Sequence, residues 1–195
     1  GTTVISGMAA GIDAAAHLAA LGVDTGTTLA VVGTGPDLAY PSYHAELRDR
    51  IAARGAVVSE HPPGTPAKPA HFPSRNRILA GLALGTLVVE ATERSGALIT
   101  ARQAGDYGRE VFAVPGSIHN PLARGCHRLI REGAGPAESA KEVLDALAPM
   151  AGELASFLRG RLAGTLARPH AEPGDPLAPL DHDYQPLWLA LGHDP

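Results

Sequence analysis

The sequence predicts an α/β fold in which a parallel sheet is connected by right-handed helical crossovers. Short apolar runs rich in β-branched residues recur along the chain, and they are continuous rather than alternating, as buried parallel strands are. A helical segment separates neighbouring runs, and a glycine stands at or just beyond each helix end. Strand and helix therefore alternate through most of the chain.

Five strands are expected, at residues 3–5, 29–32, 56–58, 87–89 and 111–114. The helices between them are expected at residues 12–21, 43–53, 76–84 and 97–107. Their ends are marked by four glycines, which are expected to favour a left-handed C-terminal cap: Gly22, Gly55, Gly85 and Gly108.

The domain organisation follows from changes in composition. Residues 1–147 hold the α/β pattern, and because they begin on a strand we expect that a first strand and helix are missing. Residues 148–179 are rich in proline and predict a linker that contains one short helix at 152–162. Residues 180–195 are expected to open a second module, which stops after one helix.

Composition excludes several classes of protein. Hydrophobic residues make up 45% of the chain, enough to bury a core, so wholesale disorder is excluded. No run of 18 apolar residues occurs and no signal peptide opens the chain, so we expect a cytoplasmic protein. The single cysteine, Cys126, excludes an internal disulfide framework, and the nine histidines lack metal-ligand spacing, so no metal or cofactor is expected.

Charge is unevenly distributed along the chain. The formal net charge is −4, yet residues 68–131 hold nine Lys or Arg residues against four acidic ones. The local field rather than the total charge governs anion binding, so this middle third predicts an anion-binding surface. The alternative is that several of these arginines are solvated helix faces or structural ion pairs.

The loop after the first strand holds two glycines four residues apart, Gly7 and Gly11. Such a strand-to-helix turn can direct backbone N–H groups at a phosphate, although a plain tight turn is the alternative. It is neither a Walker A loop nor a dinucleotide fingerprint. The second loop has Leu38 where that fingerprint needs a third glycine, which counts against an NAD enzyme.

A proline-rich segment from Glu60 to Pro73 leads to Phe72, Arg75, Asn76 and Arg77 at the start of a helix. An aromatic ring beside two guanidinium groups and an amide suits a single strand of nucleic acid, through stacking, phosphate pairing and hydrogen bonding. The alternative is that the ring fills the core and the asparagine caps the helix.

The loop at residues 90–96 leads into another helix, which Ser95 can cap. Arg94 stands near the positive end of that helix, where an anion would bind, with Gly96 beside it and Thr100 one turn further in.

Catalytic groups are poorly arranged. Cys126 and His127 are adjacent on a predicted helix and therefore point in different directions, so a buried thiol is expected in place of a nucleophile and its base. Glu90 and Glu93 offer a carboxylate pair, one of which is expected to be structural. We therefore expect no catalytic residues and no enzyme.

The motifs, in chain order, are Ser6-Gly7-Met8-Ala9-Ala10-Gly11-Ile12-Asp13, Tyr40-Pro41, Phe72-Pro73-Ser74-Arg75-Asn76-Arg77-Ile78, Val88-Val89-Glu90-Ala91, Arg94-Ser95-Gly96-Ala97-Leu98-Ile99-Thr100-Ala101, Val114-Pro115-Gly116-Ser117 and Arg124-Gly125-Cys126. As a set, with this order and spacing, they resemble the DNA-processing protein family DprA, also called Smf, over about residues 1–147.

The resemblance implies an extended Rossmann-like parallel sheet with helices on both faces. It also implies a non-catalytic protein that binds single-stranded DNA, forms a homodimer and loads RecA onto DNA during natural transformation. Residues 180–195 would then begin a winged-helix domain. The DNA-binding residues implied are Ser6, Gly7, Gly11, Phe72, Arg75, Asn76, Arg77, Arg94, Ser95, Gly96 and Thr100. Because the turn at 7–11 and the helix start at 95–96 are two backbone anion sites that face a basic loop, we expect DNA at the carboxyl edge of the sheet with its phosphates at these two places.

The sequence also departs from the family pattern. Ala10 stands where the family usually has an arginine that contacts DNA, and Ser74 replaces a frequent basic residue, so a weaker, salt-dependent affinity is expected. The alternative function is that of a nucleotide-processing enzyme similar to the LOG phosphoribohydrolases. The segment Pro115-Gly116-Ser117 lacks the glycines of their phosphate loop, while Arg94 and Glu90 match the residue types of their catalytic pair.

Overall fold

The computed structural model describes residues 2–166, and the expected start of a winged helix lies outside these described residues. The chain divides into two compact units, Gly1–Ala151 and Gly152–Pro195. The first unit holds both sheets, and the fold and the sites described below belong to it. No helix among the described residues is both long and apolar enough to cross a membrane.

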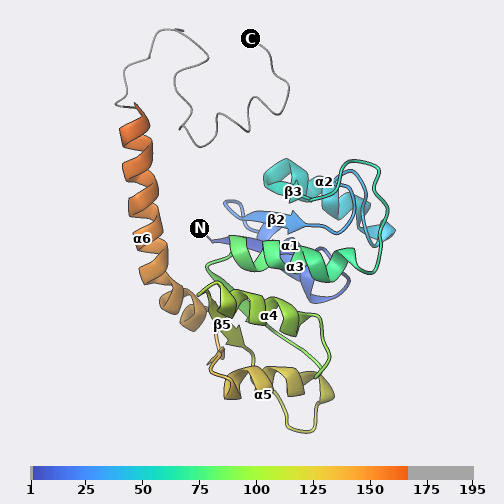
Figure 1. Ribbon diagram of the computed structural model, residues 1–195, viewed down its shortest axis with the longest axis vertical. Coiled ribbons are helices and arrows are strands. Elements are labelled where there is room, and N and C mark those ends of the chain that lie inside the picture. Colours follow the sequence, from blue (N-terminus) through green and yellow to red (C-terminus); the bar gives the residue numbers. More distant parts are fainter. Residues whose placement is uncertain (1, 167–195) are drawn as a thin grey trace, which may run out of the picture. The chain divides into compact units, whose positions relative to one another are not determined.

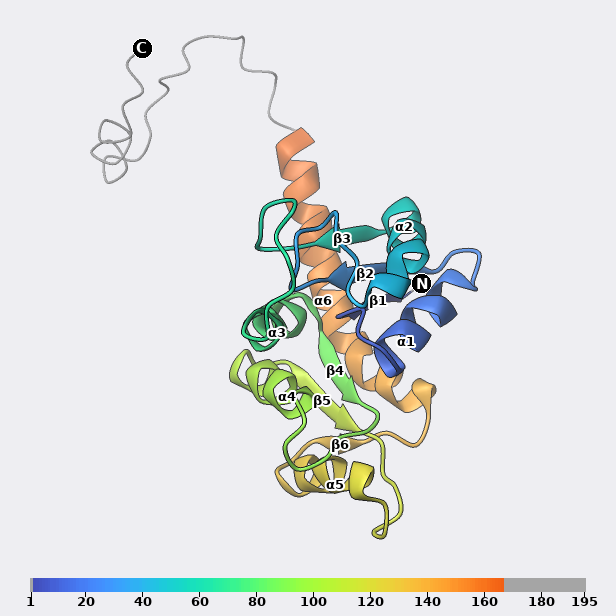
Figure 2. The ribbon, with the colours of Figure 1, turned by 90° about the vertical axis from the view of Figure 1, so that its right-hand side faces the viewer.

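The α/β class is confirmed. The strands of the described residues form two parallel three-stranded sheets, with the orders β1-β2-β3 and β4-β5-β6. Figure 1 shows the course of the chain, and Figure 2 labels these strands. Strands that follow one another in the chain are neighbours in each sheet, so each helical crossover spans a single strand position. The strands are β1 (Thr3–Ser6), β2 (Thr27–Val31), β3 (Ala56–Val58), β4 (Gly85–Val88), β5 (Glu110–Ala113) and β6 (Gly135–Pro136).

Helices cover both faces of the strands. Figure 2 shows α1 and α2 on one side of the first sheet and α3 on the other, where α3 packs against α4. The helices are α1 (Ile12–Leu21), α2 (Ala45–Arg54), α3 (His71–Leu82), α4 (Ala97–Asp106), α5 (Arg124–Arg131) and α6 (Ala140–Leu166), with 3-10 turns η1 (Ser42–His44) and η2 (Pro121–Ala123).

Two helices differ from the sequence-based expectation. The third helix begins at His71 rather than Asn76, because Pro73 lies in its first turn, where a missing N–H costs no helical hydrogen bond. The helix expected at 152–162 is part of α6, which continues through Pro149 where a linker was expected to begin. The short strand β6 was not anticipated from the sequence, and the helix predicted around Cys126 and His127, whose bounds were not predicted, is α5.

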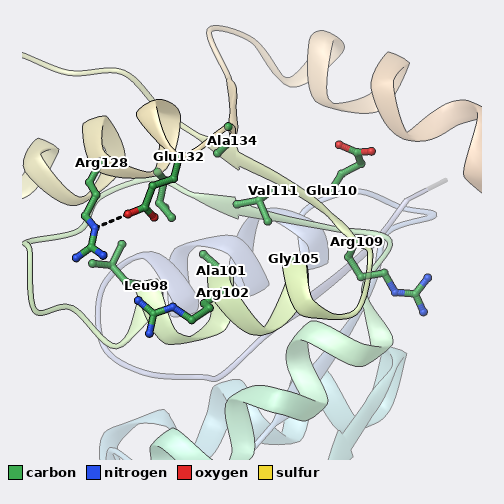
Figure 3. A pocket seen from close by; sticks show the side chains of 12 residues that line it. Leu98, Ala101, Arg102, Gly105, Arg109, Glu110, Val111, Arg128, Glu132 and Ala134 are labelled. Atoms are coloured by element: carbon green, nitrogen blue, oxygen red, sulfur yellow. Dashed lines mark hydrogen bonds and ion pairs between the residues drawn. The ribbon is translucent and has the colours of Figure 1, made fainter.

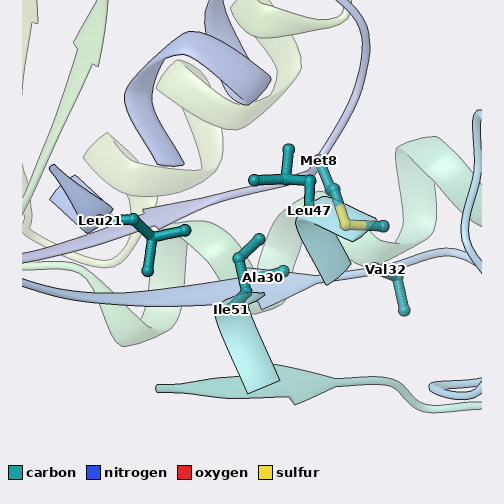
Figure 4. Close-up of a cluster of buried hydrophobic side chains, with 6 residues drawn as sticks. All are labelled: Met8, Leu21, Ala30, Val32, Leu47 and Ile51. Carbon is teal, nitrogen blue, oxygen red and sulfur yellow. The ribbon is translucent and has the colours of Figure 1, made fainter. Parts of the chain in front are cut away.

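The core of the first sheet lies between the strands and helices α1 and α2. Figure 4 shows the six buried side chains that form it: Met8, Leu21, Ala30, Val32, Leu47 and Ile51. A second buried cluster, which includes Val88, Ala113 and Cys126, holds the second sheet to α4 and α5. Most of these side chains are small or aliphatic, so the helices pack closely on the sheets.

Glycine at the end of α2 serves close packing rather than a left-handed cap. Gly55 has a φ of −160°, which any residue adopts, but a Cβ there would lie 1.8 Å from the carbonyl oxygen of Thr28. Gly22 also ends its helix in the right-handed region, and Gly85 is the first residue of β4 with no positive φ, so the expected left-handed caps at Gly22, Gly55 and Gly85 are wrong. Gly108, with a φ of 65°, does take that conformation.

The side chain of Arg54 closes the loop between α1 and β2. Its guanidinium donates hydrogen bonds to four backbone carbonyl oxygens at 2.6–3.1 Å, those of Leu21, Val23, Asp24 and Gly26. The C-terminal end of α1 is therefore capped by a side chain from α2.

His17 is fully buried between α1 and the first sheet. The Thr28 hydroxyl donates to the Val4 carbonyl oxygen at 2.8 Å, so it accepts the hydrogen bond from His17 Nδ1 at 2.6 Å. His17 Nε2 is buried and has no hydrogen-bond partner among the described residues. Burial lowers the pKa of His17 below its ordinary value, and the nearby Asp13 carboxylate only partly opposes this shift.

This burial makes stability depend on pH. The unfolded chain takes up a proton on His17 at about pH 6.5, before the folded chain does, so the free energy of unfolding is highest above that pH and falls as the pH drops below it. We expect His17→Gln to reduce the loss of stability between about pH 7 and pH 5, as measured by urea unfolding at several pH values. The same change at the exposed His119 is the control. An unchanged pH dependence in the His17 variant would contradict this account.

Candidate nucleic-acid interface

The turn between β1 and α1 has the backbone that the glycine pattern suggested. Met8 has a φ of 58° and Gly11 a φ of 88°, and the buried Met8 side chain anchors the turn in the core. The Ala9 N–H donates to the Asp13 carboxylate at 3.1 Å, so the chain itself uses one of the N–H groups expected to face a phosphate. The N–H groups of Ala10 and Gly11 make no hydrogen bond within the described part of the chain.

Arg75 lies beneath this turn and is only 7% exposed. Its Nη1 donates to the carbonyl oxygens of Gly7, at 2.9 Å, and Val31. The structure therefore contradicts the expectation that Arg75 presents its guanidinium to a phosphate: in this conformation the group joins the carboxyl ends of β1 and β2 to α3.

The close fit of Arg75 also explains the glycine at position 7. A Cβ on Gly7 would lie 2.2 Å from Arg75 Nη1, so any larger residue would displace the guanidinium. Burial lowers the pKa of Arg75, and the Asp13 carboxylate opposes this shift. Gly7 is therefore needed for the packing of Arg75 rather than for the close approach of a ligand.

The proline-rich segment is fixed to the rest of the first sheet. The Asp37 carboxylate accepts hydrogen bonds from the Gly64 N–H at 2.8 and 3.0 Å. The Arg77 guanidinium donates to the Glu60 carboxylate, and both side chains keep contact with solvent. Arg77 is thus at the surface as expected, but its charge is shared with an acidic residue of the loop.

The start of α3 carries the remaining residues of this predicted set. Phe72 is half-buried, with its ring 5.0 Å from that of Tyr40, and a Cβ on Gly33 would touch it at 3.3 Å. Asn76 is 9% exposed and lies inside the helix, so it is not the cap that the alternative interpretation suggested. Ser6, which belongs to the first sheet as the last residue of β1, is half-buried.

The loop between β4 and α4 keeps its polar groups at the surface. Arg94 is exposed and makes no hydrogen bond or ion pair within the described residues. Ser95 Oγ accepts from the Ala97 N–H at 3.3 Å, and the Gly96 N–H makes no hydrogen bond within residues 2–166. Thr100 is half-buried in the first turn of α4. This helix start therefore offers one unpaired N–H beside one unpaired cation.

A cavity of about 300 Å³ lies elsewhere, between α4 and α5 over the start of β5 (Figure 3). Its cations are largely engaged or turned away: Arg128 donates to Glu132 at 2.7 Å, and Figure 3 shows Arg109 pointing away from the other charged groups. A smaller hollow of about 180 Å³ adjoins Arg94 and shares Arg102 with the larger one. We do not place the candidate site in the larger cavity.

Among the described residues, Cys126 and His127 do not form a pair of nucleophile and base. Cys126 is fully buried, and burial raises the pKa of its thiol, which disfavours the reactive thiolate. His127 contacts the Gly116 carbonyl oxygen through Nε2 at 2.9 Å and does not serve the thiol. No cluster of three or more histidine, cysteine or acidic side chains suited to a metal occurs among the described residues.

Two residues of this site were missed as individual contributors from the sequence. The sequence motifs include Tyr40 and Asp13, but the sequence assigns neither residue a role of its own. The signal for Asp13 was its position two residues after Gly11, in the first turn of a helix, where a carboxylate accepts backbone N–H bonds.

The fold and the two polar strand-to-helix turns define the class of this protein: it is an α/β domain with candidate anion-binding turns at the carboxyl ends of its strands. A family profile described as DNA recombination-mediator protein A matches residues 1–148. The chain therefore belongs to that family, and the resemblance inferred from the motifs is confirmed.

Curated relatives agree with this assignment. The DNA processing protein DprA of Streptococcus pneumoniae is 51% identical over 141 residues, which are 72% of this chain and 50% of the relative. Protein Smf of Escherichia coli is 49% identical over 148 residues, 75% of this chain and 39% of the relative. The chain thus spans half the length, or less, of these two relatives.

Solved structures share the fold. The crystal structure of DprA from Streptococcus pneumoniae has a TM-score of 0.68 at 49% identity, and the match covers 73% of this chain and 50% of that one. DprA from Helicobacter pylori, whose structure is described in terms of its single-stranded DNA binding mode, has a TM-score of 0.66 at 23% identity, with 75% and 66% covered.

The contact between Gly7 and Arg75 can be tested by stability. We expect Gly7→Ala to lower the free energy of unfolding by about 2 kcal/mol or more, because the added methyl group displaces a guanidinium and leaves buried carbonyls without a donor. Gly96→Ala is the matched control, since nothing lies within 4 Å of a Cβ there. Urea unfolding measures both, and equal effects of the two substitutions would contradict the role given to Arg75.

Proposed function

We propose that this chain binds single-stranded DNA at the carboxyl ends of β1, β2 and β4, without catalysing a reaction on it. The observation that carries the proposal is the pair of strand-to-helix turns that keep unpaired N–H groups, at Ala10, Gly11 and Gly96. Phosphate oxygens are the natural acceptors for such groups, because the helix dipole also favours a negative charge there.

The nearby side chains support a single strand as the ligand. Arg94 and Arg77 supply positive charge at the surface, and Tyr40 and Phe72 place a pair of aromatic rings at the start of α3. Phosphate pairing combined with stacking is typical of proteins that bind unpaired nucleic acid. Membership of a family of DNA recombination mediators agrees with this ligand.

The non-catalytic part of the proposal rests on the buried, protonated Cys126 thiol and on a histidine that serves the backbone instead. The test is to incubate the purified protein with AMP and with oligonucleotides. We expect neither release of a free base nor strand cleavage. Turnover of either kind would favour an enzyme of the nucleotide-processing type.

Loading of RecA, a role in natural transformation, a homodimer and a cytoplasmic location are further proposals, supported by the family resemblance. Light scattering tests the dimer. A strand-exchange assay with RecA tests the mediator role, and it should use the full-length protein because the relatives extend well beyond this chain.

Charge reversal tests the DNA interface. We expect Arg94→Glu and Arg77→Glu to weaken binding of a labelled single-stranded oligonucleotide by about tenfold or more, and to reduce the slope of log affinity against log salt by about 0.7. Arg131→Glu makes the same change of net charge at the far end of α5 and should leave both quantities close to those of the unmodified protein. Equal losses in all three variants would point to a general charge effect and would refute a local interface.

Position 10 provides a gain-of-function test. Ala10 is exposed, between the turn residue Met8 and the start of α1, so an arginine there has room to reach a phosphate on the turn. We expect Ala10→Arg to strengthen binding by up to about 1 kcal/mol and to steepen the salt slope by about 0.7. Anisotropy titrations at several salt concentrations measure both. Unchanged values would mean that DNA does not pass over this turn.

A further inference from the structure

Aromatic residues are scarce in this chain, yet they gather at one edge of the first sheet. The sequence holds three Phe, four Tyr and one Trp. Three of these eight, Tyr40, Tyr43 and Phe72, lie on the loops that follow β2 and at the start of α3. Tyr40 is 50% and Tyr43 71% exposed, although large aromatic side chains contribute most to stability when buried.

The exposed rings are held in place from below. The Tyr40 ring packs on Phe72 with an interplanar angle of 41°, and a Cβ added to Gly33 would lie 3.3 Å from the Phe72 ring. Behind Phe72, His71 Nδ1 bonds the Gly33 carbonyl oxygen at 2.9 Å, and its ring stacks on His61. Tyr40 therefore packs on Phe72, whose neighbour His71 is hydrogen-bonded to the loop that follows β2.

Tyr43 lies next to a histidine that contacts the turn which we assign to a phosphate. Its ring meets the His44 ring edge to face, with centroids 4.7 Å apart, and His44 Nδ1 contacts the Met8 carbonyl oxygen at 3.0 Å. Met8 belongs to the same turn as the unpaired N–H groups of Ala10 and Gly11. An exposed ring thus lies on the element that is hydrogen-bonded to the candidate phosphate site.

We propose that Tyr40 and Tyr43 form a stacking platform for unpaired bases of the strand whose phosphates bind the Gly7–Gly11 turn. The proposal rests on the proposed function and adds to it the groups that distinguish a single strand from a duplex. In a duplex the bases are already stacked on each other and cannot reach a protein ring, whereas an unpaired base offers its face. Stacking on a ring is tolerant of sequence because every base has a π-face.

Stacking and phosphate pairing have different signatures, which makes the platform testable apart from the cationic groups. Loss of a stacked ring lowers the affinity for DNA but does not change the number of counterions that binding releases. The slope of log affinity against log salt therefore stays constant. An oligonucleotide with abasic sites retains its phosphates but has no bases to stack. Its binding affinity should therefore lack the contribution of the tyrosines and keep that of Arg94.

The experiment uses the whole chain, a labelled oligothymidine and an abasic oligonucleotide of the same length. We expect Tyr43→Ala and Tyr40→Ala each to weaken oligothymidine binding by about tenfold at an unchanged salt slope, and to leave abasic binding unaltered. Tyr43→Phe should bind like the unmodified protein, because it keeps the ring. Tyr107→Ala is the control: Tyr107 is also 50% exposed but lies at the other end of α4 from the β4–α4 loop.

The outcomes separate the two proposals. The stacking platform is overturned if both alanine variants bind oligothymidine like the unmodified protein. It is also overturned if the alanine substitutions weaken binding of the abasic oligonucleotide as much as binding of oligothymidine. Neither result contradicts the phosphate sites. No binding of any oligonucleotide by the unmodified chain overturns the proposed function itself. Because both tyrosines are at least half exposed, we expect the variants to fold, and thermal unfolding confirms that affinity is compared between folded proteins.

Discussion

The carboxyl edge of the first sheet depends on one buried guanidinium. Arg75 comes from α3 and bonds carbonyl oxygens at the ends of two neighbouring strands, through Gly7 and Val31. Its loss would leave buried acceptors without partners, which is more costly than the net value of the hydrogen bonds themselves. The same contact fixes the start of α3, and with it Phe72 and Arg77, relative to the Gly7–Gly11 turn. The sequence predicts that Arg75 binds a ligand, but its guanidinium instead joins the strands and the helix around which the candidate ligand sites lie.

The electrostatics of this edge are more balanced than its arginines suggest. Asp13 lies near Arg75 and bonds the turn, and Glu60 pairs with Arg77, so two of the cations face carboxylates. Arg94 is the exposed cation of the candidate set that has no such partner within residues 2–166. In a chain whose formal net charge is −4, the proposed DNA binding therefore depends more on oriented N–H groups and aromatic rings than on the overall field.

The fold class and most elements could be predicted because continuous apolar strands and amphipathic helices leave a local pattern in the sequence. The helix Ile12–Leu21 was predicted at its observed bounds, and the strand Ala56–Val58 likewise. The helix start at His71 was missed because Pro73 was interpreted as a boundary although it is tolerated in a first turn. The position of Arg75 could not be predicted, because an arginine near a phosphate-like turn has the same sequence signature whether it points outward or is buried beneath the turn. Only the contact with Gly7, across 68 positions in the chain, distinguishes the two.

Arg54 has a consequence for how this domain opens. Its guanidinium belongs to α2, yet the four carbonyls it bonds lie in the last turn of α1 and the loop that follows. Detaching either helix alone would separate the Arg54 guanidinium from the carbonyl oxygens that it bonds. We therefore expect α1 and α2 to unfold locally as one cooperative unit rather than one after the other. The amide protons of the α1–β2 loop, although close to solvent, should then exchange at the slow rate set by that shared opening.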